Sequence, residues 1–304
     1  MARIRSSLLA ALLWAAAAPG AEAALKIFAT TPDLSALARE IGGDKVSVES
    51  LAMPRQNPHF VEPKPSLIIK LMKADVLIET GLELESAWLG PLVGGSRNPK
   101  IQLSGSGRID ASEAVAPIEV PQAPTRAMGD VHPGGNPHYM TDPENVLLVC
   151  LLIAQRLSAL DPENAKAFES NAEDFNRRLR AKIKEWTGAL KPYAGRKYVG
   201  YHKDPSYFAR RFGMESAGEI EPKPGIPPSP RHTAELIARM KAERVRLIFT
   251  HPWFESRTPN AIAQETGAFV LILALFPEEV PGTPDIISTI DRNVYQVKEA
   301  LAAP

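Results

Sequence analysis

Apolar positions along the first hundred residues follow two periods in turn, and this alternation predicts strands and helices in succession. Residues 25–30 read as a strand, and residues 31–43 begin with Thr-Pro and end on two glycines, which are helix start and stop signals. The two patterns then repeat, with strands predicted at 45–51, 75–81 and 99–105 and helices at 64–74 and 82–93. Strands that alternate with helices indicate βαβ units and a mostly parallel sheet.

One helical pattern is much longer than the others. Residues 162–190 contain nothing that breaks a helix except Gly188 near the end. Apolar side chains recur there at helical spacing, namely Phe168, Phe175, Leu179 and Ile183. A helix of this length extends for about 40 Å, which is more than a single lobe of this size needs. We therefore predict that this helix links two lobes.

The alternation of strands and helices returns after the long helix. Strands are predicted at 196–202, 215–221, 244–252 and 268–276, with helices at 206–213, 229–243 and 258–267 and a helical end. The predicted fold class is α/β, with two lobes that each hold a mostly parallel sheet flanked by helices. The predicted boundaries are 24–160 for the first lobe, 161–191 for the linking helix and 192–304 for the second lobe.

The amino terminus has the pattern of a secretory signal. A short basic region precedes an apolar run, and Ala-Glu-Ala ends at Ala23 as a cleavage site with small residues. We predict a signal peptide at 1–23 that is cleaved after about Ala23. No cysteine lies near the cut, so no lipid anchor is expected, and no second long apolar segment is evident. The mature protein is therefore expected to be soluble and periplasmic.

Charge and cysteine content exclude several classes of function. Lysine plus arginine number 35 and aspartate plus glutamate number 35, so no nucleic-acid or membrane-surface partner is expected. The single cysteine, Cys150, lies in an apolar helical stretch, which excludes an internal disulfide and predicts a buried, unreactive thiol.

Three histidines lie where chain segments are expected to converge. His59 follows the strand at 45–51, His138 precedes the helix that contains Cys150, and His202 ends the first strand of the second half. Ligands of open α/β sheets bind beyond the carboxyl ends of the strands, and converging imidazoles favour a transition metal, zinc above all. Each histidine alone could equally be a hydrogen-bonded turn residue. Two of them share an Asn-Pro-His setting, in which proline restricts the backbone.

Four segments together resemble one family, namely NPHFVEPKPS, GNPHYMTDP, YHKDPSYFARRFG and EPKPGIPPSPRH. The family is the metal-binding solute-binding proteins of bacterial zinc and manganese ABC importers, and the similarity covers the whole mature chain. The resemblance implies two Rossmann-like lobes joined by one rigid helix, with metal in the cleft and His59, His138 and His202 as ligands. A histidine at the third position goes with zinc more than manganese in that family. An added imidazole also favours zinc on chemical grounds.

The fourth ligand is where the sequence departs from the family. The family places an aspartate late in the second lobe, and this chain has none at the expected place. We predict Glu278 as the fourth ligand, because a carboxylate oxygen can bind zinc. Glu279, Asp285, His251 and a water molecule are the alternatives.

Four other side chains are expected to have a secondary part in the site or none. His132, in a proline-rich and glycine-rich loop at about 110–137, could gather metal or be an ordinary exposed histidine. His232 is expected on a surface helix and not as a ligand. Asp204 could accept a hydrogen bond from a ligating imidazole, as such rings generally require. Glu62 could do the same, and a solvated acid in a turn is an equally good description.

The sequence therefore predicts a periplasmic protein that captures Zn²⁺ with high affinity and delivers it to an ABC permease, as a monomer and not as an enzyme. The main alternatives are a manganese-binding importer component and a periplasmic zinc metallochaperone. A separate periplasmic metallochaperone could also be a partner of this protein. A zinc hydrolase would need a general base and a substrate pocket, and no motif supplies either. A surface adhesin on the same scaffold would fit poorly with the missing lipid anchor.

Overall fold

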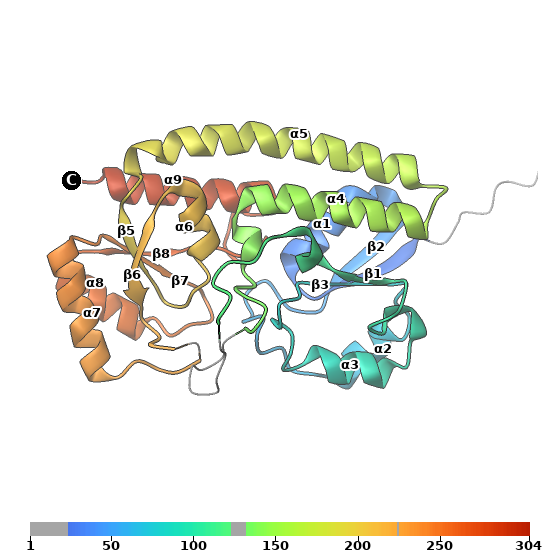
Figure 1. Cartoon of the computed structure of the whole chain (residues 1–304), viewed down its shortest axis with the longest axis horizontal. Helices are drawn as coiled ribbons and strands as arrows, with labels where there is room; N and C mark the ends of the chain where they lie inside the picture. Colours follow the sequence, from blue (N-terminus) through green and yellow to red (C-terminus); the bar gives the residue numbers. More distant parts are fainter. Residues whose placement is uncertain (1–23, 123–131, 224) are drawn as a thin grey trace, which may run out of the picture.

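The computed structural model describes residues 24–122, 132–223 and 225–304. Figure 1 shows two α/β lobes beside each other, with one long helix that runs above both. Each lobe holds a four-stranded sheet in which all paired strands are parallel, so the predicted fold class is confirmed. The predicted signal peptide, residues 1–23, lies outside the described residues.

The first lobe is built on a sheet with the strand order β2-β1-β3-β4. Its strands are β1 (Leu25–Ala29), β2 (Val46–Ser50), β3 (Val76–Glu79) and β4 (Arg108–Asp110). Its helices are α1 (Pro32–Gly42), α2 (Pro65–Leu71), α3 (Leu89–Ser96) and α4 (Pro143–Leu160). Three of these helices begin with proline, whose missing N–H costs nothing in the first turn.

The second lobe repeats the topology of the first, with the strand order β6-β5-β7-β8. Its strands are β5 (Lys197–Gly200), β6 (Glu215–Glu219), β7 (Leu247–Thr250) and β8 (Phe269–Ile272). Its helices are α6 (Ser206–Phe212), α7 (Pro230–Glu243), α8 (Arg257–Thr266) and α9 (Ile286–Ala302). In each lobe the first strand lies between the second and the third, so the chain changes direction across the sheet at the same place. The reversal of strand order leaves a crevice beyond the carboxyl ends of the first and third strands, and open α/β sheets bind their ligands in such a crevice.

Two predicted elements of the first lobe are wrong. The segment 99–105 forms a short 3-10 helix, Pro99–Ile101, followed by turns, and the fourth strand comes later as β4. The segment 82–93 is helical only from Leu89, because Leu82 and Glu83 have positive φ values of 50° and 60° that no right-handed helix allows. Local turn conformations decided the outcome in both places, and Leu103, which the strand pattern placed on the same face as the buried Ile101, is 88% exposed.

Helix α4 qualifies by length and composition as a membrane span, with a mean hydropathy of 1.4, although no second long apolar segment was expected. One face of α4, including Val146, Cys150, Ile153 and Leu157, is buried in the core. Its apolar character therefore has a structural explanation inside a packed lobe.

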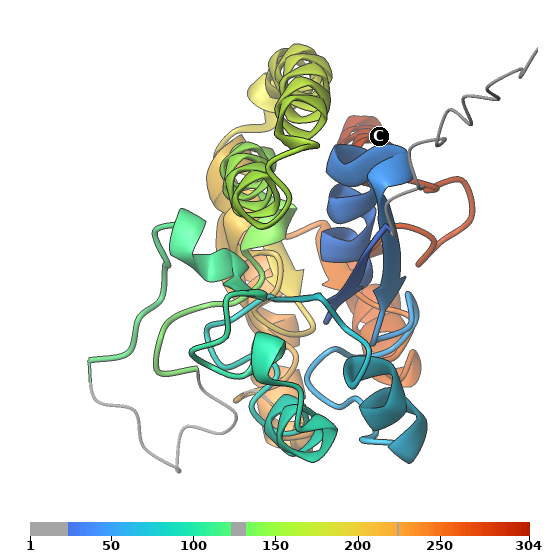
Figure 2. The same cartoon turned by 90° about the vertical axis from the view of Figure 1, so that its right-hand side faces the viewer.

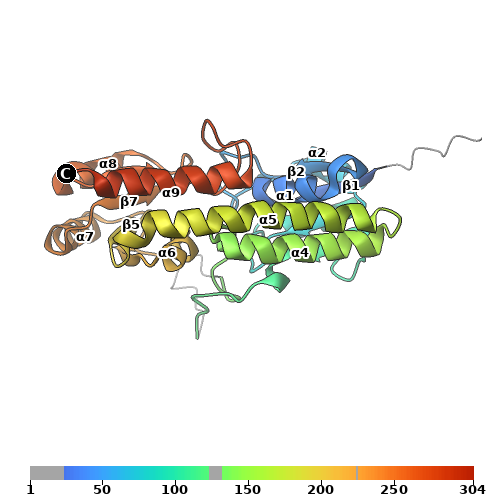
Figure 3. The same cartoon turned by 90° about the horizontal axis from the view of Figure 1, so that it is seen from above.

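The long helix α5 (Ala165–Leu190) falls within the predicted 161–191. Viewed from above, it lies beside α4 over the first lobe and beside α9 over the second (Figure 3). Figure 2 shows the same layer end on, with α4 and α5 stacked and α1 and α9 next to them. Phe168, Phe175, Leu179 and Ile183 are all buried, as the spacing predicted. They belong to one core cluster that also contains strand residues of both sheets.

Candidate metal centre

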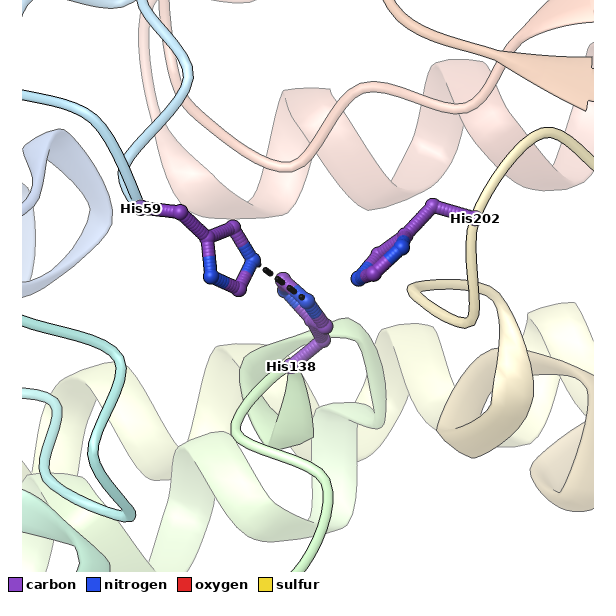
Figure 4. A group of neighbouring side chains, drawn as sticks. All are labelled: His59, His138 and His202. Carbon is purple, nitrogen blue, oxygen red and sulfur yellow. Dashed lines mark hydrogen bonds between the residues drawn. The ribbon is translucent and has the colours of Figure 1, made fainter. Parts of the chain in front are cut away.

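His59, His138 and His202 converge on one point from three separate segments (Figure 4). His59 lies in the loop between β2 and α2, His138 just before α4, and His202 just after β5. One ligand atom of each ring lies within 4.8 Å of the other two, and each residue is at most 8% exposed. The structure thus brings together side chains that are 79 and 64 residues apart in the sequence.

Two asparagines shape the loops that carry the first two histidines. The Asn57 side-chain oxygen accepts a hydrogen bond from the backbone N–H of His59 at 3.0 Å, and Asn136 does the same for His138 at 2.9 Å. Each Asn-Pro-His segment is therefore a local turn closed by its own asparagine. Asn136 also donates to the backbone oxygen of Lys203 at 2.8 Å, next to His202. From the sequence, only the proline of this shared motif was expected to restrict the backbone.

The pKa values of the first two histidines are lowered. Burial, followed by repulsion from the rings of His202 and His132, holds the pKa of His59 well below 6.5. Burial and then the rings of His59 and His202 act in the same way on the pKa of His138. Both imidazoles are therefore neutral at physiological pH, which is the form that binds metal.

The third histidine has a carboxylate partner, and it is not the predicted one. His202 Nδ1 lies 3.1 Å from Oε2 of Glu221, which follows β6. Asp204, the acid expected to orient a ligating ring, instead forms a buried ion pair with Nε2 of His251. Asp204 and Glu221 both line the pocket that contains the three histidines, but they contact different rings.

His251 is part of a second buried cluster, which includes Asp204 from the lining of the pocket. Its Nε2 contacts Asp204, and its Nδ1 lies 3.2 Å from Oε1 of Glu279. Burial alone would lower the pKa of His251, but the charge of Asp204 and the hydrogen bonds to Asp204 and Glu279 outweigh it and raise the pKa to about 10. His251 is therefore a cation at physiological pH. A protonated ring has no lone pair to offer a metal.

None of the candidates for the fourth ligand joins the three histidines in the described part of the chain. The side chain of Glu278, the predicted ligand, is exposed and outside the histidine cluster. Glu279 is buried, but its Oε2 accepts hydrogen bonds from the backbone N–H groups of Leu275 and Phe276 at 2.7 and 3.0 Å. Asp285 caps α9 by accepting from the Ser288 N–H at 2.7 Å. The structure therefore gives Glu279 and Asp285 structural roles and offers no support for Glu278.

Of the remaining residues, one lies beside the histidine cluster and the others lie away from it. The ring of His132 stacks on that of His59, with centroids 5.0 Å apart, so it lies beside the cluster. His232 approaches the backbone oxygen of Glu219 at 2.9 Å and lies outside the histidine cluster of the described residues. Glu62 is exposed and pairs with Lys64. Burial raises the pKa of the Cys150 thiol to about 12, which makes it unreactive.

The spacing within the cluster fits a tetrahedral ion. The Nε2 atoms of His59 and His138 lie 3.3 Å apart. Two ligand nitrogens on a tetrahedral zinc ion, with bonds of about 2.0–2.1 Å, are separated by about 3.4 Å. Two lobes with three buried imidazoles between them define a bilobed metal-binding protein.

Comparison with known proteins identifies the family. The sequence profile of the family described as zinc-uptake complex component A, periplasmic, matches residues 27–300. The chain belongs to this family, which groups substrate-binding transport proteins and not enzymes. The resemblance inferred from the four motifs is confirmed.

Individual relatives name two different metals. The high-affinity zinc uptake system protein ZnuA of Brucella abortus (strain 2308) is 29% identical over 157 residues, which cover 52% of this chain and 47% of that protein. The chain thus matches about half the length of such curated relatives. The manganese ABC transporter substrate-binding lipoprotein PsaA of Streptococcus mitis is 25% identical over 248 residues, or 80% of this chain and 77% of that one. A crystal structure of ZnuA superposes with a TM-score of 0.77 at 27% identity, covering 91% of this chain and 98% of that chain.

Proposed function

We propose that this protein captures Zn²⁺ between its two lobes and delivers it to an ABC permease. His59, His138 and His202 are the proposed ligands. The observation that carries the proposal is the convergence of these three buried imidazoles, two of them held neutral, from loops of both lobes. Because the ligands come from both lobes, binding would join the lobes and release would require them to separate slightly.

Zinc is preferred over manganese on the chemistry of the ligands. Three imidazole nitrogens suit zinc, whereas manganese is a harder ion that favours oxygen ligands. The zinc uptake relatives support this choice, and the manganese transporter relative supports the alternative of a manganese importer component. Competition between the two ions distinguishes them, and we expect zinc to displace manganese from the site.

The fourth coordination position is proposed to hold a water molecule or another exchangeable ligand. Glu278 would reach the site only if its exposed loop rearranged on binding, and Glu279 would have to break its contact with His251. A weakly held fourth ligand suits a carrier, because the ion must leave as well as bind.

The proposed location is the periplasm, and the proposed partner is a membrane permease of an ABC importer. The family description and the signal pattern at 1–23 support both. A monomer is expected. A periplasmic metallochaperone, as an upstream partner or as the role of this chain itself, is the remaining alternative. Loss of zinc-limited growth on deletion, restored by the gene only when the permease is present, would favour import.

The direct test measures the metal content and affinity of the mature chain, residues 24–304. Wild type should hold one zinc ion, and His138→Ala should bind it at least about 100-fold more weakly, since one of the few ligands is lost. His232→Ala removes a histidine outside the cluster and serves as the matched control. A wild-type protein without bound zinc, or equal losses in the two variants, would refute the proposal.

A further inference from the structure

We propose that Glu221 is a positioning residue that determines which nitrogen His202 offers to the metal, and that it thereby sets the affinity of the site. This inference rests on the proposed function, since it treats His202 as a zinc ligand. Glu221 had no predicted role beyond its place in the motif EPKPGIPPSPRH.

The contact between the two side chains fixes the tautomer of the ring. Oε2 of Glu221 lies 3.1 Å from Nδ1 of His202, and the two side chains are 12% and 10% exposed. An ionised carboxylate only accepts hydrogen bonds, so Nδ1 must carry the proton. In a neutral ring protonated at Nδ1, Nε2 keeps its lone pair. His59 and His138 also approach each other through Nε2, so all three rings would present the same nitrogen.

The sheet of the second lobe holds Glu221 in place before any metal arrives. Its backbone N–H donates to the oxygen of Tyr201 at 3.0 Å, which extends the pairing of β6 with β5 and brings Glu221 next to the following residue, His202. Its Oε2 also accepts from the backbone N–H of Gly225 at 3.3 Å. The carboxylate is therefore preorganised, and little entropy is lost when it supports a bound ion.

Glu221 also supplies charge that the ligands lack. Three imidazoles bring no negative charge to a dication. The other acid that lines the pocket, Asp204, is already paired with the His251 cation. A carboxylate behind a ligating imidazole makes the ring a stronger donor, and loss of such a partner typically costs about 10–100-fold in metal affinity.

The test compares Glu221→Gln with the matched control Glu219→Gln in the mature chain. The control removes a carboxylate two residues away that accepts a hydrogen bond from Ser216 at 3.1 Å and lies outside the pocket of the three histidines. Competition titration should show zinc affinity lowered about 10–100-fold in Glu221→Gln and unchanged within about 2-fold in Glu219→Gln. Equal affinities of wild type and Glu221→Gln would overturn the inference.

A spectroscopic measurement separates positioning from a general loss of structure. Nitrogen-15 NMR of the histidine rings should show His202 protonated at Nδ1 in the wild type, with and without zinc. Glu221→Gln should show a mixture of tautomers in the metal-free protein, because an amide can donate to Nδ1 as well as accept from it. A wild-type ring protonated at Nε2 would overturn the inference while leaving zinc capture intact. A wild type that binds no zinc would overturn the proposed function as well.

Discussion

Two buried clusters of this protein contain histidine, and they have opposite electrostatic character. In the first, His59 and His138 face each other and His202, and their pKa values fall well below 6.5. In the second, His251 lies between Asp204 and Glu279, and its pKa rises to about 10. Burial pushes the rings of His59, His138 and His251 toward the neutral form, so the neighbouring charges decide the difference.

The comparison shows how one residue type serves two purposes. His251 carries a proton of its own, which offsets part of the charge of its two carboxylates and leaves the ring no lone pair for a metal. Burial and the neighbouring rings keep the facing pair His59 and His138 neutral, so both can offer lone pairs to an incoming cation. A buried histidine is therefore a candidate ligand only when its surroundings keep it neutral.

The largest expected effect is a loss of stability when the protonated His251 is replaced by an uncharged residue. His251→Leu leaves Asp204 and Glu279 buried without their partner, and breaking a buried ion pair in this way costs about 3–5 kcal/mol. Urea unfolding of the metal-free protein should show this loss of unfolding free energy. His232→Leu is the control and should cost no more than about 1 kcal/mol, the value of one ordinary hydrogen bond. Similar losses of unfolding free energy in both variants would mean that the ion pairs of His251 do not stabilise the folded protein.

The next effect tests the first cluster by its metal affinity. His59→Ala should weaken zinc binding about 100-fold or more, because it removes one of three protein ligands. The same change should abolish most of the rise in melting temperature that zinc produces in the wild type. A variant that zinc still stabilises as strongly as the wild type would exclude His59 from the site.

A further effect should appear in the pH dependence of stability, with opposite signs for the two clusters. His251 binds a proton more tightly in the folded state, so its contribution is complete below pH 6.5 and is lost as the pH rises through about 10. His59 and His138 bind a proton more tightly in the unfolded state, so stability falls as the pH drops below 6.5. Unfolding free energies at several pH values, with His251→Leu for comparison, test both slopes. A wild type whose stability does not decline between pH 7 and 10 would contradict the assignment of charge to His251.

The smallest effect is expected at Glu278. Its side chain is exposed, so Glu278→Gln should change zinc affinity by less than about 2-fold, as surface substitutions do. Competition titration of Glu278→Gln and His59→Ala under the same conditions compares their zinc affinities directly. A large loss would instead restore Glu278 as the fourth ligand and imply that its loop moves when zinc binds.

The sequence predicted the two lobes and the three converging histidines well, because each depends on a local signal. Apolar periodicity located the buried face of α5, and short motifs located His59, His138 and His202. Sequence alone could not assign each acid to its histidine. Asp204 is two residues from His202 but contacts His251, whereas Glu221 is 19 residues away and reaches His202 through the register of β5 and β6.

The errors in the first lobe have a similar cause. Glu85 was expected on a helix, but its carboxylate is buried and accepts hydrogen bonds from the Thr30 hydroxyl and the Thr80 N–H, the latter at 2.7 Å. Burial raises its pKa, to about 7, despite these bonds. A side chain that connects the ends of β1 and β3 is specified by tertiary contacts, and helical periodicity does not reveal such contacts.

Helix α5 has a consequence for how this molecule loses its structure. Phe168, Ile183 and their neighbours belong to a single core that includes Ile27 of one sheet and Phe249 of the other. Neither lobe can expose its half of that core without disturbing the other, so the two should melt in one cooperative transition. Calorimetry should then give a single peak, and an ion held at one edge of the cleft would protect the whole chain against unfolding.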